Sequence, residues 1–353
     1  MKRAALPCLG LTLLMWCGWS LSADEVTAPE APTHEAITHD SAGHARFDLN
    51  RPEVVAFVDH LATQGMTRAE IYHLLAKAEP QPKIIDAMTR PAEKALQWWE
   101  YRARFLTPER IDAGARLWRE HRELLDAVAM QWHVDPEYIV AILGVETYFG
   151  RITGRYRVLD ALATLSFDYP ARGEFFRTEL EQFLLLAHEG ALDPLATLGS
   201  YAGAMGMVQF MPSSFRRYAV KEGDAKRPDL WNDWGDIFGS VGNYLQQHGW
   251  EYGRPVLAEA TLGTAPEPTP PSSVALNDTL GALRSRGMQV DSAQSDDTAC
   301  LTLLAPLQSG PSYRVGFHNF YVITRYNRSP LYAMAVHDLA LAISARTLAA
   351  DAP

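Results

Sequence analysis

The segment from Asp135 to Gly150 constrains the fold more than any other part of the chain. It reads Asp-Pro-Glu-Tyr-Ile-Val-Ala-Ile-Leu-Gly-Val-Glu-Thr-Tyr-Phe-Gly, which is apolar at its centre. Asp135 is a good capping residue, Pro136 suits the first helical position, and a glycine often follows a helix end. The segment therefore predicts a helix with an apolar face.

One carboxylate, Glu146, lies on that apolar face. It shares a helical stripe with three apolar residues that precede it by seven, four and three positions: Ile139, Ile142 and Leu143. Burial raises the pKa of a glutamic acid, and a general acid must hold its proton near neutral pH. The pattern equally fits a buried glutamate paired with an arginine, for which the chain offers Arg151, Arg155 and Arg172.

Helical signals also dominate the rest of the chain. Asn50 and Pro52 favour a helix start, Thr67 with Glu70 forms a capping box, and Lys94 to Phe105 predicts a helix with an aromatic face. The composition is that of a globular protein, with 47% hydrophobic and 21% charged residues. Proline-rich sequence with short apolar runs over 255–315 predicts strands in a small domain or insertion, after which Ser329 and Pro330 start another helix.

The first residues have the pattern of an export signal. Lys2 and Arg3 precede an apolar run that ends at Leu21, and cleavage after Ser22 fits the small residues there. We therefore expect a signal peptide over 1–22 and a flexible arm over 23–46. The alternative is an uncleaved membrane anchor. A lipid anchor on Cys17 is disfavoured, because the residue before it is tryptophan.

Several classes of function are not supported by the sequence. A net charge of −10 without a long basic run argues against a nucleic-acid partner. The chain has no Gly-x-Ser-x-Gly elbow, no His-Glu-x-x-His helix and no Cys-x-x-Cys pair. Removal of the signal would leave Cys300 alone among the three cysteines, which makes a disulfide framework and a catalytic thiol improbable.

A second group of unusual residues lies between Gly199 and Ser214. Glycines at 199, 203 and 206 allow close backbone approach and positive φ, as in a loop that lines a cleft. Ser200 and Gln209 supply neutral hydrogen-bonding groups that suit sugar hydroxyl and acetamido groups. The alternative is that the glycines only permit tight helix packing.

A third group follows the apolar run that begins at Asn319. Tyr326, Asn327 and Tyr332 surround a polar turn before the last predicted helix and could face a ligand. Taken alone, they equally fit turn and core positions.

Together, these segments resemble the membrane-bound lytic murein transglycosylase B family, glycoside hydrolase family 103. The resemblance covers about 47–349, weakly over 255–315. It is carried by Gly-Val-Glu-Thr at 144–147, Leu-Asp-Ala-Leu-Ala-Thr-Leu-Ser-Phe at 159–167, Ala-Gly-Ala-Met-Gly at 202–206, Gln-Phe-Met-Pro-Ser-Ser-Phe at 209–215 and Phe-Tyr-Val-Ile-Thr-Arg-Tyr-Asn at 320–327.

The resemblance implies a mainly α fold with a lysozyme-like helical core. We expect an N-terminal helical domain over 47–121, the catalytic core over 122–254, a small strand-containing insertion over 255–315 and a return to the core over 316–349. It also implies a periplasmic enzyme that acts on peptidoglycan glycan strands and requires no cofactor. Cell-wall synthesis or remodelling proteins are the candidate protein partners.

The implied reaction cleaves the bond between N-acetylmuramic acid and N-acetylglucosamine and leaves a 1,6-anhydro end. By resemblance, Glu146 is the single catalytic acid and base, in an exception to the usual pair of carboxylates. Other positions match residues of the family's cleft that orient the glutamate or contact sugars: Ser200, Gln209, Tyr244, Tyr326, Asn327 and Tyr332. Arg172 matches one of a basic pair that could meet the peptide stem, although its neighbour here is Ala171.

One departure concerns metal. Some relatives carry a calcium loop with acidic or amide ligands at alternate positions. In this chain Lys221, Gly223 and Ala225 occupy the first three ligand positions, so we expect no calcium site.

Two rival functions differ from a transglycosylase in their products. A peptidoglycan-binding scaffold would release no fragments, whereas a muramidase that uses water would release hydrolysed ends. The intact sequence around Glu146 and Gln209 argues against the scaffold.

Overall fold

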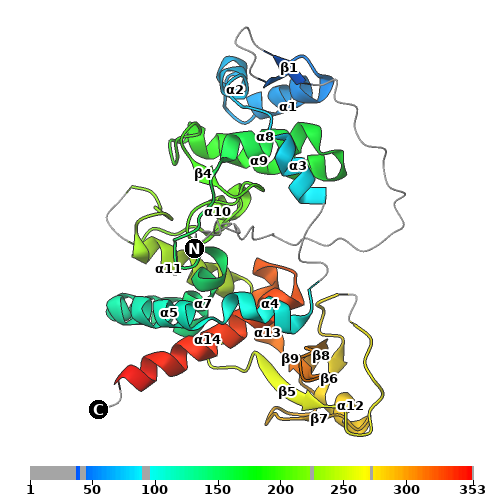
Figure 1. Ribbon diagram of the computed structural model, residues 1–353. Coiled ribbons are helices and arrows are strands. Elements are labelled where there is room, and N and C mark those ends of the chain that lie inside the picture. Colours follow the sequence, from blue (N-terminus) through cyan, green and yellow to red (C-terminus); the bar gives the residue numbers. More distant parts are fainter. Residues whose placement is uncertain (1–36, 40–44, 90–95, 223–225, 271–272, 352–353) are drawn as a thin grey trace, which may run out of the picture.

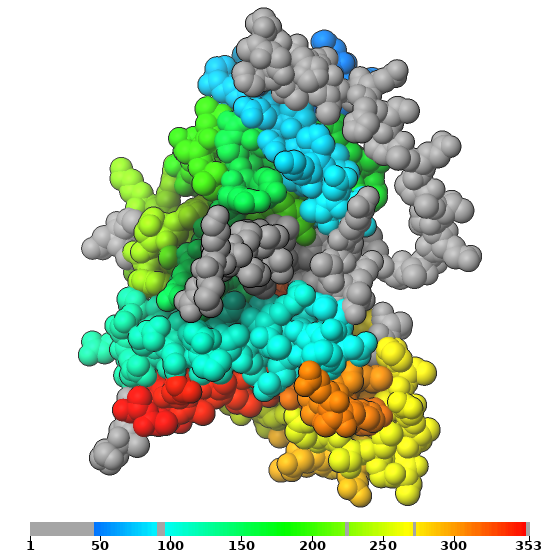
Figure 2. Space-filling view, in the orientation of Figure 1, coloured from blue at the N-terminus to red at the C-terminus, as the bar shows by residue number. Residues whose placement is uncertain are grey.

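The computed structural model describes residues 37–39, 45–89, 96–222, 226–270 and 273–351 (Figure 1). Two groups of helices lie one above the other, and a small antiparallel sheet lies beside the lower group (Figure 1). The space-filling view shows the same arrangement, with the sheet in yellow to orange next to the cyan and red helices (Figure 2).

Helix α7 (Pro136–Thr147) lies at the centre of the lower group, and every residue from Tyr138 to Thr147 is buried. It is covered by helices from four other parts of the chain: α5 (Pro108–Glu120), α6 (Arg122–Trp132), α11 (Trp234–Gln247) and α14 (Pro330–Asp351). The predicted apolar face is therefore one side of a helix that is buried all round.

Helix α14 is the longest helix among the described residues. By length and composition its stretch Pro330–Ala350 could cross a membrane, yet half of its most apolar window is buried inside the structure. In this fold α14 packs against α7, α5 and α4 (Trp98–Phe105), as a core helix does.

The upper group forms around two helices, α8 (Val158–Asp168) and α9 (Gly173–His188), which are joined by the short 3-10 turn η3 (Pro170–Arg172). Near the end of α8, the Phe167 ring meets Phe57 edge-on at 5.8 Å. Arg51 pairs with Asp168 at 2.6 Å. These contacts hold α1 (Pro52–Ala62) on α8. Helix α2 (Arg68–Leu75) packs on α1, and α3 (Pro82–Thr89) packs directly on α8.

The stretch 47–121, predicted as one N-terminal helical domain, divides between the two groups. Helix α3 packs on α8, whereas α4 and α5 pack on α14. Trp98 and Phe105 of α4 are buried where α4 packs on α14, and Ile84 of α3 is buried where α3 packs on α8, although all three belong to one continuous hydrophobic core.

The small sheet has strand order β6-β8-β9-β5-β7 and pairs antiparallel throughout. Its strands are β5 (Leu257–Thr261), β6 (Asp278–Thr279), β7 (Gln289–Val290), β8 (Ala299–Leu304) and β9 (Tyr313–Gly316), with the short helix α12 (Leu280–Ser285). Cys300 is buried among the sheet's own apolar side chains, and burial raises the pKa of its thiol to about 12. Arg314 of β9 ties the sheet to α14 through Asp338 at 2.8 Å.

Some predicted helix ends are correct and others are wrong. The Thr67 side chain accepts a hydrogen bond from the Glu70 amide, which confirms that cap. Asp135 precedes α7 but does not cap it, because its carboxylate instead accepts from Trp250 Nε1 at 2.8 Å and from the Gly253 amide. The helix predicted from Lys94 begins at Trp98, with Gln97 as its cap.

The predicted leader and most of the predicted arm lie outside the described residues. Two short strands nevertheless fall at the end of the arm, where β1 (Ile37–His39) pairs antiparallel with β2 (Ala45–Phe47). This differs from the flexible stretch expected over 23–46. Phe47, the last residue of β2, is buried and meets the Phe167 ring, which anchors the pair.

Candidate active site

Glu146 lies in the last turn of α7 and is only 7% exposed. The chain leaves the helix immediately afterwards, because Tyr148, Phe149 and Gly150 all have positive φ. This run of left-handed residues ends α7 one residue after Glu146 and turns the chain away from it.

Tyr332 is the partner that defines the position of the Glu146 carboxylate. Its hydroxyl donates to Glu146 Oε1 at 2.6 Å, and the tyrosine is completely buried in the first turn of α14. Burial, together with the neighbouring Glu146 charge, raises the pKa of Tyr332 well above its ordinary value. The hydroxyl therefore keeps its proton and remains a donor to the carboxylate.

The arginines considered as structural partners of Glu146 all lie against aromatic rings. Arg151 stacks on Tyr148 at 4.7 Å, Arg155 on Tyr156 at 5.9 Å, and Arg172 on Phe175 at 4.6 Å. Among the described residues, Glu146 accepts a hydrogen bond from a neutral phenol, that of Tyr332.

The glycine-rich stretch forms a tight loop beside α7, as its glycines predicted. Gly203 and Gly206 have φ of +87° and +70°. A Cβ on Gly199 would come within 2.2 Å of the Ala204 carbonyl oxygen, so this position requires glycine for space. Ser200 Oγ accepts from the amides of Ala202 and Ala204, which closes the loop.

Two hydrogen bonds join this loop to the chain that follows Glu146. Thr147 Oγ1 donates to the Met207 carbonyl at 2.9 Å. The Gln209 side-chain amide donates to the carbonyls of Thr153 and Gly206. Gln209 also has a φ of +51°, so its side chain is held in one place by an uncommon backbone conformation.

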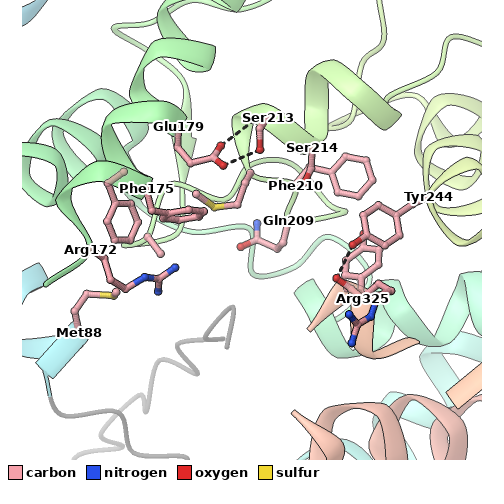
Figure 3. A pocket seen from close by; sticks show the side chains of 14 residues that line it. Met88, Arg172, Phe175, Glu179, Gln209, Phe210, Ser213, Ser214, Tyr244 and Arg325 are labelled. Atoms are coloured by element: carbon pink, nitrogen blue, oxygen red, sulfur yellow. Dashed lines mark hydrogen bonds between the residues drawn. The ribbon is translucent and has the colours of Figure 1, made fainter. Parts of the chain in front are cut away.

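A cleft opens on the other side of Gln209 (Figure 3). Four of the predicted site residues line it: Arg172, Gln209, Tyr244 and Tyr326. The Tyr244 and Tyr326 rings lie 4.6 Å apart, and their hydroxyls donate to the carbonyls of Arg325 and Val208. Both tyrosines line the cleft, although they are only 7% and 8% exposed and their hydroxyls are already hydrogen-bonded.

The structure places the remaining predicted residues behind the cleft. Asn327 is buried, and its side-chain oxygen accepts from the Ser329 amide at the start of α14. Ser200 closes its own loop, and Tyr332 contacts Glu146. These three residues hold the elements that carry the site.

Sequence reasoning missed a buried carboxylate that lines this cleft, as Glu146 does not. Glu179 of α9 is 3% exposed, and it accepts from the amide and the hydroxyl of Ser213 at 2.9 and 2.7 Å (Figure 3). Burial raises its pKa. The signal was the same as for Glu146, since Glu179 shares an apolar helical stripe with Phe176 and Phe183.

The described ends of the stretch compared with a calcium loop are bonded to one side chain, that of Asp236. Asp236 of α11 is buried, and its two oxygens accept from the amides of Glu222 and Asp229 at 2.7 and 2.8 Å. Among the described residues, no group of three His, Cys, Asp or Glu side chains could hold a metal ion.

A buried carboxylate at a helix end, beside a cleft walled by aromatic rings and amides, is suited to proton transfer on a carbohydrate. The helical fold around it places the chain among the lysozyme-like glycan-cleaving enzymes, which confirms the predicted fold class. Comparison with known proteins is more specific. Residues 50–341 match the family model described as Transglycosylase SLT domain, and the chain belongs to this family.

Individual relatives agree. The membrane-bound lytic murein transglycosylase B of Escherichia coli K12 is 37% identical over 305 residues, which cover 84% of this chain and 83% of that protein. The crystal structure of soluble lytic transglycosylase SltB1 from Pseudomonas aeruginosa is 44% identical with a TM-score of 0.77, covering 84% of this chain and 99% of that one. SltB3 of the same organism, in complex with NAG-anhNAM-pentapeptide, is 30% identical with a TM-score of 0.72, over 82% and 78%.

Proposed function

We propose that this chain is a peptidoglycan lytic transglycosylase and that Glu146 is its single catalytic acid and base. The family and the names of the relatives support the activity. The hydrogen bond between Tyr332 and Glu146 is the observation that supports the role of the glutamate. The substrate is the bond between N-acetylmuramic acid and N-acetylglucosamine.

In the first step, Glu146 donates its proton to the glycosidic oxygen, and the bond from that oxygen to C1 of the muramyl residue breaks. The carboxylate left behind is stabilised by the Tyr332 hydroxyl, which stays protonated because burial raises its pKa. A hydrogen bond to the charged form favours ionisation, so this contact strengthens as the proton leaves.

In the second step, the same carboxylate takes the proton of the muramyl C6 hydroxyl while O6 bonds to C1. The product is a 1,6-anhydro ring, and Glu146 regains its proton. Because the sugar supplies its own nucleophile, no carboxylate is required to activate a water. Glu179, the buried carboxylate in the cleft wall, already accepts hydrogen bonds from Ser213 and is not needed for these two steps.

The cleft residues bind the glycan in this proposal. The rings of Tyr244 and Tyr326, tilted by 57° to one another, supply apolar surface in the cleft for a sugar ring, and the Gln209 side-chain oxygen can accept from a hydroxyl or acetamido group. Arg172, at the other wall, meets the peptide stem. Ser200 and Asn327 act indirectly, by holding the loop and α14 in place.

Mass spectrometry of digested sacculi tests the proposal. The wild-type protein is expected to release muropeptides with 1,6-anhydro ends, which are lighter by one water than hydrolysed ends. Glu146→Gln should lower this release at least about 1,000-fold, since acid and base catalysis are both removed. An unchanged thermal midpoint shows that the variant is folded. Glu137→Gln is the matched control, because Glu137 lies in the first turn of the same helix.

Three outcomes would decide against the proposal. Continued anhydro release by Glu146→Gln removes the catalytic role. Hydrolysed ends identify a muramidase. The absence of any new fragment identifies a binding scaffold.

The relative named as membrane-bound acts on the cell wall, outside the cytoplasm. For this chain we propose a periplasmic location after cleavage behind Ser22, without lipid on Cys17. N-terminal sequencing of the protein purified from a periplasmic extract tests both points. A mature chain that begins at a lipidated Cys17 and fractionates with membranes would overturn them.

A further inference from the structure

Arg325 is a cation in the cleft wall that the proposed reaction does not use. It lies in the last turn of α13 (His318–Tyr326), and its guanidinium carbon stacks 4.1 Å from the centre of the Tyr321 ring. Nη2 donates to Thr324 Oγ1 at 2.9 Å. The stacking and this bond fix the plane of the guanidinium.

The Nη1 end of this guanidinium is left to meet a ligand. Nε of Arg325 is buried without a hydrogen-bond partner within the described chain, whereas Nη1 makes no hydrogen bond there and is not among the buried unpartnered atoms. None of the described carboxylates forms an ion pair with Arg325. An arginine presents five N–H donors in a rigid fork that matches a carboxylate. By contrast, Arg314 of β9 is paired with Asp338 of α14.

Arg325 and Arg172 lie on opposite sides of Gln209 (Figure 3). Arg172 lies on the wall formed by η3 and α9, whereas Arg325 lies beneath Tyr244 on the wall formed by α13. A glycan that passes over Gln209 therefore meets one cation on each side. In peptidoglycan, every second sugar carries a lactyl group, and the carboxylates lie either on this group or on the stem peptide attached to it.

We propose that Arg325 binds a carboxylate carried on the lactyl side of a muramyl residue, at the opposite wall from Arg172. This inference rests on the proposed function and specifies its substrate as a glycan anchored by anionic groups at two points. The carboxylate belongs either to a stem peptide or to the lactyl group of a stem-free residue.

Binding to the Glu146→Gln protein separates these sources without turnover. Three tetrasaccharides are titrated by calorimetry: one with stem peptides, one from which an amidase has removed them to leave lactyl carboxylates, and chitotetraose, which has no carboxylate. Adding Arg325→Gln should raise Kd about 10- to 100-fold for the ligand whose carboxylate is bound, as expected for a charged hydrogen bond. Chitotetraose should bind within about twofold of its original Kd.

If affinity falls only for the ligand with stem peptides, the bound carboxylate belongs to the stem peptide. If affinity falls only for the amidase-treated ligand, it belongs to the lactyl group. An equal loss of affinity for chitotetraose, or no loss for any ligand, overturns the inference.

Arg217→Gln is the control, because Arg217 also stacks on a tyrosine, at 5.2 Å, but does not line the cleft. If Arg325→Gln unfolds, Arg325→Lys keeps the charge without the fork and should show a smaller loss with the same ligand selectivity. Failure of the proposed function would be seen separately, as wild-type protein that releases no anhydro ends.

Discussion

The Tyr332 hydroxyl lies 2.6 Å from Glu146 Oε1, although the two residues are 186 positions apart in the chain. Glu146 ends the most buried helix of the lower group, and Tyr332 begins the helix that covers it. The geometry of the carboxylate is therefore set by the packing of α14 on α7, as well as by the local structure of α7.

Replacement of Tyr332 by phenylalanine should slow the reaction with little effect on binding. The ring remains, but the buried carboxylate loses its donor, so kcat should fall about 10- to 100-fold. Initial rates of anhydro-end release over a range of sacculus concentrations measure kcat and KM. Tyr72→Phe on α2 is the control. A rise in KM at unchanged kcat would assign Tyr332 to substrate binding instead.

Gly199→Ala should destabilise the protein by about 2–3 kcal/mol. Its Cβ would come within 2.2 Å of a carbonyl oxygen and 2.8 Å of Val158 Cγ2, and overpacking of this kind has such a cost. Urea unfolding gives the free energy. Gly253→Ala should lower the free energy of unfolding by only about 1 kcal/mol, because the space around Gly253 is open and the only penalty comes from its positive φ. Equal losses in the two variants would show that close packing at Gly199 is unimportant.

His337 should make the protein less stable in mild acid. Its Nδ1 lies 2.8 Å from the Tyr138 hydroxyl, and burial lowers the pKa of His337 to about 4. Between its ordinary pKa near 6.5 and about 4, the unfolded chain binds a proton that the folded chain does not. Stability therefore falls as pH decreases through this window, by about 2 kcal/mol from pH 7 to pH 5.

Urea unfolding at pH 7 and pH 5 measures this effect. His337→Gln should remove most of the difference, whereas His73→Gln, at an exposed position on α2, should keep it. If the two variants show the same pH dependence, His337 is not the group responsible.

Calcium should not stabilise this protein. Both oxygens of Asp236 are already hydrogen-bonded to the amides of Glu222 and Asp229. We expect the thermal midpoint to agree within about 1 °C in a chelator and in millimolar calcium, because a ligand stabilises only the state that binds it. Asp236→Asn should cost about 1–2 kcal/mol with or without calcium. A calcium-dependent rise of several degrees, or micromolar binding by calorimetry, would contradict the prediction.

Local signals predicted many features of the fold. Prolines at first helical positions and the Thr67 cap locate helix starts, and the glycines at 203 and 206 have the positive φ that their spacing suggested. The assignment of Asp135 failed because tertiary structure supplied better donors, in Trp250 and Gly253. The division of 47–121 between two groups depends on which distant helix each N-terminal helix packs against, α8 for α3 and α14 for α4 and α5, and this information is not local.

The candidate site also combines features that local patterns predict with contacts that they do not. Face counting predicts that Glu146 is buried but not that Tyr332 orients it, since that contact joins α7 to α14. The same counting applied to α9 would have found Glu179. No sequence pattern predicted a binding role for Arg325, because an arginine at a helix end is common. The role is inferred from its position in the cleft wall.

The position of α14 has a consequence for when the protein becomes active. A methyl group of Leu339 packs so closely on Gly144 of α7 that a Cβ there would come within 2.9 Å of it. A nascent chain that has not yet extended beyond Ser329 lacks this cover and also lacks the Tyr332 hydroxyl. We therefore expect premature termination in the small sheet, or proteolytic removal of α14, to leave a fragment in which Glu146 has lost both its cover and this hydrogen-bond donor. The last helix to be synthesised thus completes the core and the proposed active site together.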